Sequence, residues 1–274
     1  MSVPNAHDPV RLPEAVRDAM QTYVARLHNA IGELLVGVYV VGSATSRDFE
    51  SASSDIDVVC VLTRELELGE VTALRELHRA LQDESSEGAN LEVEYVARDQ
   101  LRPTGAEGEV VSISPGEDVH VGRSSSAADD IWGARNYGVP LFGPPPTEVF
   151  PDVDRDTLIR SCRASLADYA TRDQRPDATD DDYVDWTLNI ARCLFGIDRG
   201  RCPTKPEAAH WLARREPKLT VPLDAALAAR RGEPVGAAVR SEFRWYADTV
   251  CSLADDLMPL HRGRDEPAAE VREP

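Results

Sequence analysis

The chain of 274 residues is long enough for two modest domains, and its 42% hydrophobic and 28% charged residues exclude wholesale disorder. Acidic residues outnumber basic ones by 48 to 30, and the resulting net charge of −18 repels nucleic-acid phosphates while suiting a cationic small substrate. Because no apolar run approaches the ~20 residues that cross a bilayer and residues 1–10 lack a signal pattern, we expect a cytoplasmic protein without membrane or nucleic-acid partners.

The first hundred residues predict a small mixed α/β domain. Apolar residues at helical spacing indicate helices over residues 13–34 and 69–82. Short β-branched or alternating runs indicate strands over residues 36–41, 56–62 and 91–96. The order helix, strand, loop, strand, helix, strand is typical of a small mixed sheet.

The middle of the chain predicts the end of this domain. Residues 102–120 are rich in Gly, Pro, Ser and Glu, and their sequence pattern assigns them to neither helix nor strand; a short helix is expected over 127–137. The strongest break is the run Gly143-Pro144-Pro145-Pro146, so we place the domain boundary after Pro146.

Beyond this boundary the sequence pattern becomes helical throughout. Helices are predicted over residues 158–169, 183–197, 206–215, 223–231 and 235–257. The fold class is therefore expected to be α+β, with a mixed-sheet domain over residues 1–146 and an all-helical domain over residues 147–261. Residues 262–274 are charged and Pro-rich and are expected to form a disordered tail.

Three carboxylates and a Gly-Ser pair are the candidate chemical residues of the first domain. Asp55 and Asp57 lie two apart at the start of a strand, so both side chains project from one face, roughly 7 Å apart at Cβ. Such a pair needs neutralisation in an apolar setting, and Mg²⁺ with oxygen ligands is the natural ion. Glu92 would add a third carboxylate if its strand pairs beside the second. Gly42 and Ser43 follow a buried strand and offer close backbone approach to a phosphate.

Taken singly, these features have simpler explanations: a paired Asp can be a turn or cap, and Gly-Ser after a strand can be a plain turn. Together, Gly42-Ser43 and Ser54-Asp55-Ile56-Asp57 resemble the signature of the nucleotidyltransferase superfamily to which DNA polymerase beta belongs. Over residues 15–258 the chain is similar to the aminoglycoside adenylyltransferases that modify streptomycin and spectinomycin. Their helical domain carries an Arg followed by a Lys, which Arg192 and Lys205 match in kind and spacing.

This resemblance implies a role for each matched residue of the first domain. Asp55 and Asp57 would hold Mg²⁺ against the triphosphate of ATP, and Gly42 and Ser43 would bind its terminal phosphates. Glu92 would be the base that takes the proton from the substrate hydroxyl. Glu94 lies two residues later on the same strand face and is the alternative base.

In the helical domain, the resemblance implies that Arg192 and Lys205 bind the phosphates of ATP and that Asp182 contacts the acceptor. Arg192 and Asp182 each have an alternative explanation from the residues alone, whereas a Lys205 cation at a helix start is slightly unfavourable unless a phosphate binds there. Arg192 fits an exposed helix position, and the acidic run that contains Asp182 fits a helix N-terminus capped by Thr179. The stretch 168–176 lacks the Trp that precedes the second-domain Arg helix in the streptomycin-modifying enzymes, so streptomycin itself is not indicated.

The function that follows is Mg²⁺-dependent transfer of AMP from ATP to a hydroxyl of an aminoglycoside or aminocyclitol, with release of pyrophosphate, by a protein expected to be a monomer. One alternative is a nucleotidyltransferase whose acceptor is another metabolite or a protein side chain. The other is a catalytically silent nucleotide-binding module.

Overall fold

The computed structural model describes residues 12–46, 49, 54–124 and 126–257. The chain forms two compact units, residues 1–158 and residues 159–274, and the division falls inside helix α6 (Arg155–Tyr169). The domain boundary expected after Pro146 precedes that division and stays a prediction. The tail expected over residues 262–274 lies outside the described residues.

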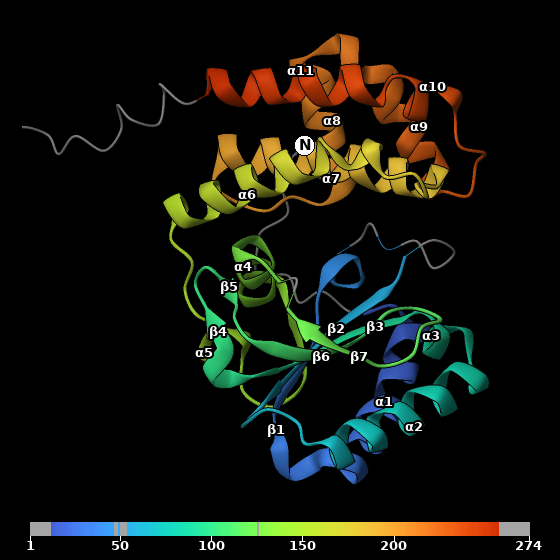
Figure 1. The fold of residues 1–274 in the computed structure, drawn as a ribbon, viewed down its shortest axis with the longest axis vertical. Helices are drawn as coiled ribbons and strands as arrows, with labels where there is room; N and C mark the ends of the chain where they lie inside the picture. The colour runs from blue at the N-terminus through green and yellow to red at the C-terminus, as the bar shows by residue number, and fades with distance from the viewer. Residues whose placement is uncertain (1–11, 47–48, 50–53, 125, 258–274) are drawn as a thin grey trace, which may run out of the picture. The chain divides into compact units, whose positions relative to one another are not determined.

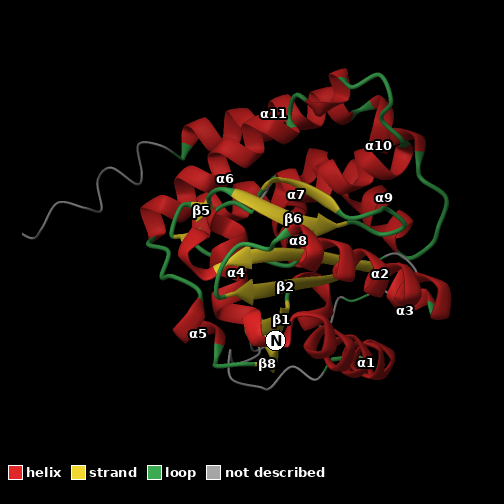
Figure 2. Ribbon diagram, turned by 60° about the horizontal axis from the view of Figure 1, so that its bottom comes forward, coloured by secondary structure: helices red, strands yellow, loops and turns green. Residues whose placement is uncertain are grey.

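The first unit is built on a mixed sheet, which confirms the predicted fold class (Figures 1 and 2). The described strands form a six-stranded sheet in the order β7-β6-β3-β2-β1-β8. Its members are β1 (Leu35–Val40), β2 (Ile56–Leu62), β3 (Leu91–Ala97), β6 (Glu109–Ile113), β7 (His120–Arg123) and β8 (Val139–Phe142). Of these neighbours, β2 and β3 run parallel and the others antiparallel. A separate hairpin pairs β4 (Leu101–Arg102) with β5 (Gly105–Ala106).

One face of this sheet is covered by α1 (Glu14–Ile31) and α2 (Leu68–Glu84), with the short α3 (Ser86–Ala89) before β3. The core on this face takes alternate residues of the strands, including Ile56, Val58 and Cys60 of β2. Residues between them on β2 therefore project from the opposite face. Helix α4 (Ala128–Tyr137), which lies between β7 and β8 in the sequence, packs against the 3₁₀ turn η2 (Gly42–Thr45).

A chain of buried polar groups crosses this core. The Tyr23 hydroxyl lies 2.8 Å from the Tyr95 hydroxyl and 3.1 Å from the Cys60 sulfur, and His78 Nε2 lies 2.7 Å from the Tyr95 hydroxyl. These side chains come from α1, β3, β2 and α2, so the hydrogen bonds join four elements. Burial raises the pKa of both tyrosines and raises that of the Cys60 thiol to about 12, so all three are uncharged in the folded protein.

The second unit is helical, as predicted. After the short α5 (Pro146–Val149) and α6, the chain continues through α7 (Asp180–Arg199), α8 (Lys205–Arg215), α9 (Thr220–Arg230), α10 (Ala237–Ser241) and α11 (Phe243–Asp256). Helix α7 packs against α8, α9, α10 and α11 and is buried along most of its length. The single helix expected over residues 235–257 is instead divided into α10 and α11 at Glu242, where ψ is 0°.

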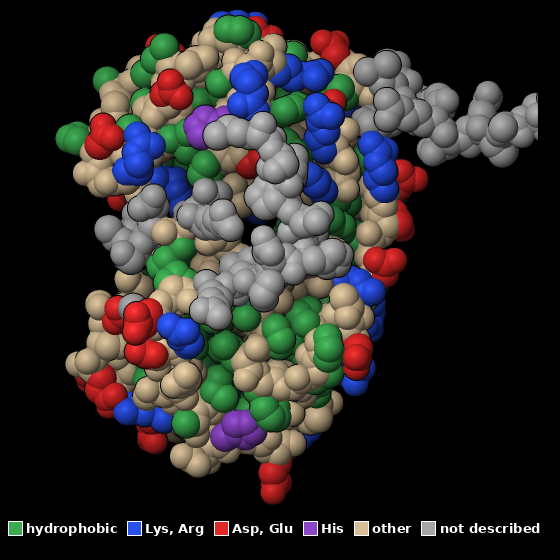
Figure 3. Space-filling view, turned by 180° about the vertical axis from the view of Figure 1, so that it is seen from behind, with side chains coloured by type: hydrophobic (Ala, Val, Ile, Leu, Met, Phe, Trp, Pro, Cys, Tyr) green, Lys and Arg blue, Asp and Glu red, His purple; other side chains and the backbone are tan. Residues whose placement is uncertain are grey.

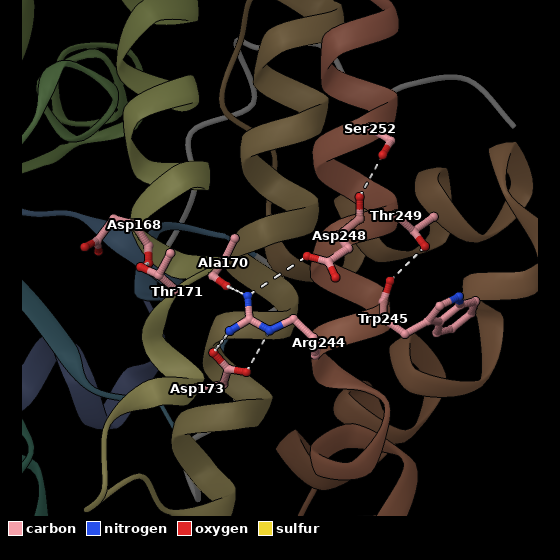
Figure 4. Close-up of polar contacts among 9 residues, drawn as sticks. All are labelled: Asp168, Ala170, Thr171, Asp173, Arg244, Trp245, Asp248, Thr249 and Ser252. Atoms are coloured by element: carbon pink, nitrogen blue, oxygen red, sulfur yellow. Dashed lines mark hydrogen bonds and ion pairs between the residues drawn. The ribbon is translucent and has the colours of Figure 1, made fainter.

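Arg244 of α11 ties this helix to the connection between α6 and α7 (Figure 4). Its guanidinium forms a two-pronged pair with the Asp173 carboxylate and donates a 3.0 Å hydrogen bond to the Ala170 carbonyl. The Asp173 side chain is only 18% exposed, so the pair is better shielded than an ordinary surface ion pair.

No helix among the described residues combines the length and apolar character that a membrane span requires. On the face shown in Figure 3, Lys and Arg side chains lie interspersed with Asp and Glu on each unit. Despite the net charge of −18, this face therefore carries no continuous acidic surface.

Candidate functional site

The parallel pairing of β2 and β3 brings two of the predicted carboxylates side by side. Asp57 lies directly opposite Glu92, as Ile56 lies opposite Leu91. Because Ile56 and Leu91 point into the core, Asp57 and Glu92 share the other face of the sheet. Asp55, two residues before Asp57 and just ahead of the strand, is exposed.

The Gly-Ser turn lies directly against the second of these aspartates. Gly42 has a φ of +63°, a conformation that favours glycine, and a methyl group at this position would overlap the Asp57 carboxylate. The Val41 amide donates a 2.9 Å hydrogen bond to the Asp57 carbonyl, which fastens the end of β1 to the start of β2. Hydroxyls of Thr45 and Ser46 satisfy the carbonyls of Gly42 and Ser43 at 2.8 and 2.9 Å.

The carboxylates of Asp55 and Asp57 fit a magnesium ion that is also coordinated by the phosphates of a bound nucleotide. The described residues include no cluster of three His, Cys, Asp or Glu that forms a ready-made metal cage. Mg²⁺ is commonly held by one or two carboxylates together with phosphate oxygens and water. Asp57, a carboxylate beside a turn that admits close backbone approach, and the exposed Asp55 two residues before it suit that arrangement.

Glu94 shares the face of Glu92 but has different surroundings. Its register partners are Val59 on β2 and Ser112 on β6. One carboxylate oxygen accepts a hydrogen bond from the Ser124 hydroxyl and the other from the Ser126 hydroxyl. Both oxygens of the Glu94 carboxylate are therefore engaged by serine hydroxyls.

The two predicted cations of the second unit are joined by side chains of α7. Lys205 pairs with the Asp185 carboxylate, whose other oxygen accepts a 2.8 Å hydrogen bond from Asn189 Nδ2. The Asn189 oxygen accepts in turn from Arg192 at 3.1 Å. The Arg192 Nε donates to the Pro203 carbonyl at 3.2 Å, so Arg192 is more than an exposed helix residue.

Lys205 is placed by the start of α8. The Thr204 side chain caps this helix by accepting from the Glu207 amide at 3.3 Å, and Pro206 occupies the first turn. A cation at a helix N-terminus is disfavoured by the helix dipole, and the Asp185 carboxylate offsets that cost here.

Asp182 lies at the N-terminus of α7 and forms a capping box with Thr179. One oxygen of its carboxylate accepts from the Thr179 amide at 2.8 Å and from the Thr179 hydroxyl at 2.7 Å. These hydrogen bonds lower the pKa of Asp182. The capping explanation of the acidic run is thus realised, and contact with an acceptor stays a prediction.

Sequence reasoning missed four polar residues that organise these groups. Asp185 and Asn189 are four apart on a helix, a spacing that places them on one face and that signals their contact. Ser124 and Ser126 are far from Glu94 in the chain and lie in a polar stretch, so no sequence signal connects them to it.

Comparison with known proteins bears on both units. Residues 148–252 match the protein family described as aminoglycoside adenylyltransferase, C-terminal domain. Among the solved structures that match is the crystal structure of spectinomycin adenyltransferase AAD(9) from Enterococcus faecialis with ATP and spectinomycin. The two chains are 15% identical with a TM-score of 0.69, and the match covers 87% of this chain and 99% of that one, which shows a shared fold. No curated protein sequence matches the chain.

Proposed function

We propose that the chain transfers AMP from ATP to a hydroxyl of an aminoglycoside or aminocyclitol and releases pyrophosphate, on the premise that its residues 148–252 match the C-terminal domain of the aminoglycoside adenylyltransferase family. The observation that carries the proposal is the convergence of Gly42, Asp57 and Glu92 on one face of β2 and β3. A phosphate-binding turn, a metal-binding carboxylate and a base are the parts this chemistry needs.

In the proposed reaction, the acceptor hydroxyl oxygen bonds to the α-phosphorus while the bond to pyrophosphate breaks. Glu92 takes the hydroxyl proton, and the turn at Gly42 and Ser43 binds the terminal phosphates through backbone N–H groups and the Ser43 hydroxyl. Asp55 and Asp57 would hold Mg²⁺. That ion, when bound, would neutralise charge on the triphosphate and on the departing pyrophosphate.

Arg192 and Lys205 are the proposed phosphate ligands of the helical unit. The Lys205 ammonium has three N–H donors, and the pair with Asp185 uses one side of it, so donors are left for a phosphate oxygen. Asp182, on the first turn of α7, is the proposed acceptor contact, because a carboxylate suits an amine-rich drug. The net charge of −18 is compatible with the same acceptor class.

The first experiment incubates the protein with MgATP and individual aminocyclitols and aminoglycosides and looks by mass spectrometry for an added AMP. We expect modification of at least one drug, and a loss of rate of about 10²–10⁴-fold in Glu92→Gln, because a positioned base contributes about that much. Asp57→Asn should be similarly impaired. Asp83→Asn, an exposed change on α2, is the matched control. A wild type that modifies no drug, or full activity in both site variants, contradicts the proposal.

The second experiment uses the scarcity of lysine, which occurs only at positions 205 and 218 of the sequence. We expect MgATP to protect Lys205 from an amine-reactive reagent while Lys218 reacts as before. Lys205→Gln should raise the KM for ATP about tenfold, the worth of one charge-assisted hydrogen bond. Lys218→Gln is the control. Equal protection of both lysines, or of neither, would remove Lys205 from the phosphate site.

A further inference from the structure

The feature that the proposed chemistry leaves unexplained is the second glutamate of β3. Glu92 and Glu94 project from one face of the strand, about 7 Å apart at Cβ. Both are carboxylates of the same length, yet Glu92 lies opposite Asp57 and Glu94 lies opposite Val59. Glu94 is thus one step farther from the aspartate pair along the sheet.

The Glu94 carboxylate is committed to a short segment between β7 and α4. Ser124 and Ser126 each donate a hydroxyl hydrogen bond to a different oxygen of Glu94. The Ser126 amide also donates to the Ser124 hydroxyl oxygen at 3.0 Å, so the two serines hold each other in place. A carboxylate that accepts a hydroxyl on each oxygen is an anchor for a backbone segment, and it is poorly placed to collect a proton from a substrate.

The same segment is held from a second side by the backbone. The Ala106 amide donates to the Ser126 carbonyl at 3.1 Å, and Ala127 forms an isolated antiparallel bridge with Gly105. Gly105 has a φ of +125°, and a side chain there would meet the Ser126 carbonyl. Ser126 and Ala127 are therefore held by backbone contacts with residues 105 and 106 in addition to the hydrogen bond between Ser126 and Glu94.

This anchored segment is the start of α4. Helix α4 begins at Ala128, and the Asp130 carboxylate accepts from the Ala127 amide at 2.9 Å. Helix α4 packs against the turn Gly42–Thr45, which lies against Asp57. A continuous path of contacts thus runs from Glu94 through α4 to the turn that is proposed to bind phosphate.

We propose that Glu94 is a positioning residue: by anchoring Ser124 and Ser126 it fixes the start of α4, and through α4 it holds the Gly42–Thr45 turn in place over Asp57. This inference rests on the proposed function and deepens it. It divides the two glutamates of β3 into a proton acceptor, Glu92, and an anchor, Glu94.

The conservative variant separates these two roles. In Glu94→Gln the amide oxygen can accept from one serine and the amide group can donate to the hydroxyl oxygen of the other, since a serine hydroxyl rotates. The anchor survives, whereas a base would be lost. Glu94→Ala removes the acceptor of both serine hydrogen bonds, and the double variant Ser124→Ala with Ser126→Ala removes both donors.

The kinetic test measures kcat and KM for ATP across pH. We expect kcat/KM to fall about tenfold in Glu94→Ala and in the serine double variant, and to change less than about threefold in Glu94→Gln. Combining Glu94→Ala with the serine changes should add no further loss, because both remove one interaction. The acid limb of the pH profile should persist in every Glu94 variant and disappear in Glu92→Gln. Glu76→Ala, an exposed change on α2, is the control.

A second readout does not depend on turnover. Amide hydrogen exchange over residues 126–131 should quicken in Glu94→Ala and in the serine double variant and stay as in wild type in Glu94→Gln. Loss of the acid limb in Glu94→Gln would make Glu94 the base and overturn the proposal, as would unchanged exchange in Glu94→Ala. If wild type transfers no AMP to any drug, the proposed function fails, while the exchange data still decide whether Glu94 anchors α4.

Discussion

Gly42 affects both the backbone conformation of its turn and the position of the Asp57 carboxylate. Its φ of +63° is costly for other residues, and a methyl group there would overlap the Asp57 carboxylate. We expect Gly42→Ala to lower the free energy of unfolding by about 1–2 kcal/mol, the usual cost of that conformation. We also expect kcat/KM to fall at least about a hundredfold, because the displaced carboxylate would no longer reach the proposed metal. Thermal unfolding and AMP transfer measure the two effects.

The control for this change is Gly69→Ala. Gly69 lies in the first turn of α2, and an added methyl group would meet nothing within 4 Å. Because alanine is the better helix former, this variant should be unchanged or more stable by up to about 1 kcal/mol and should keep its activity. A loss in Gly42→Ala no larger than that in Gly69→Ala would show that the close approach to Asp57 has no consequence.

The buried imidazole of His78 leads to a prediction about the pH dependence of stability. Burial lowers the pKa of its imidazole from 6.5 to about 4, and its Nδ1 has no hydrogen-bond partner among the described residues. Between these values the unfolded chain binds a proton that the folded chain does not. The free energy of unfolding therefore falls as pH is lowered from 6.5 towards 4, by about 3 kcal/mol in total, and is fully retained above that window.

The comparison variant is His78→Gln, which removes the titration and keeps a polar group near the Tyr95 hydroxyl. Urea unfolding at about pH 4.5 and about pH 7.5 should show a smaller difference for the variant than for wild type. Carboxylates contribute equally to both proteins, so the difference between them reports His78. Parallel pH profiles for the two proteins would mean that His78 is accessible to protons in the folded state.

The residues of the site could be predicted to different degrees. The position of Asp57 and Glu92 side by side on one face of the sheet was predictable, because a strand period of two fixes which side chains share a face. The register of β2 and β3 follows from their apolar residues. The anchoring of Glu94 by Ser124 and Ser126 was not predictable, since it joins residues about thirty positions apart. Sequence spacing carries no information on such a pairing.

Among the elements, strands with strong apolar patterns were predicted and short ones were missed. β1, β2 and β3 are buried runs whose pattern is plain. β6 and β7 lie in a stretch broken by Gly and Pro that masks their alternation. β8 contains Pro140, which is tolerated because β8 is an edge strand of the sheet. The helices of the second unit were predicted nearly to their ends, apart from the division at Glu242.

The docking of α11 leads to a prediction for an element. Arg244 meets Asp173 with two nitrogens and also reaches the Ala170 carbonyl (Figure 4), a geometry that a lysine cannot reproduce. Arg244→Lys should lower the free energy of unfolding by about 1 kcal/mol. Arg240→Lys is the matched control, since Arg240 meets Asp180 through one 3.3 Å contact with both side chains 58% exposed. Equal thermal midpoints for the two variants would contradict this.

For the whole molecule, the net charge of −18 makes substrate capture depend on salt. A polycationic acceptor is attracted by this field and ATP is repelled by it. We expect kcat/KM for the acceptor to fall as ionic strength rises towards about 0.15 M, where charges farther apart than about 8 Å are screened. The kcat/KM for ATP should not fall in parallel. Steady-state kinetics with each substrate varied in turn measures both, and identical salt responses would exclude long-range attraction of the acceptor.

The alternation along β2 and β3 ties activity to correct folding. Ile56, Val58 and Cys60 fill the core, while Asp57 projects from the other face of the same strand. A slip of one residue would drive the Asp57 carboxylate into hydrocarbon and expose the apolar set. A misregistered chain would thus lose its proposed catalytic groups and its stability together, and it would be exposed to the proteases that remove unfolded chains. The removal of misfolded chains would therefore also remove chains whose proposed active site is wrongly assembled.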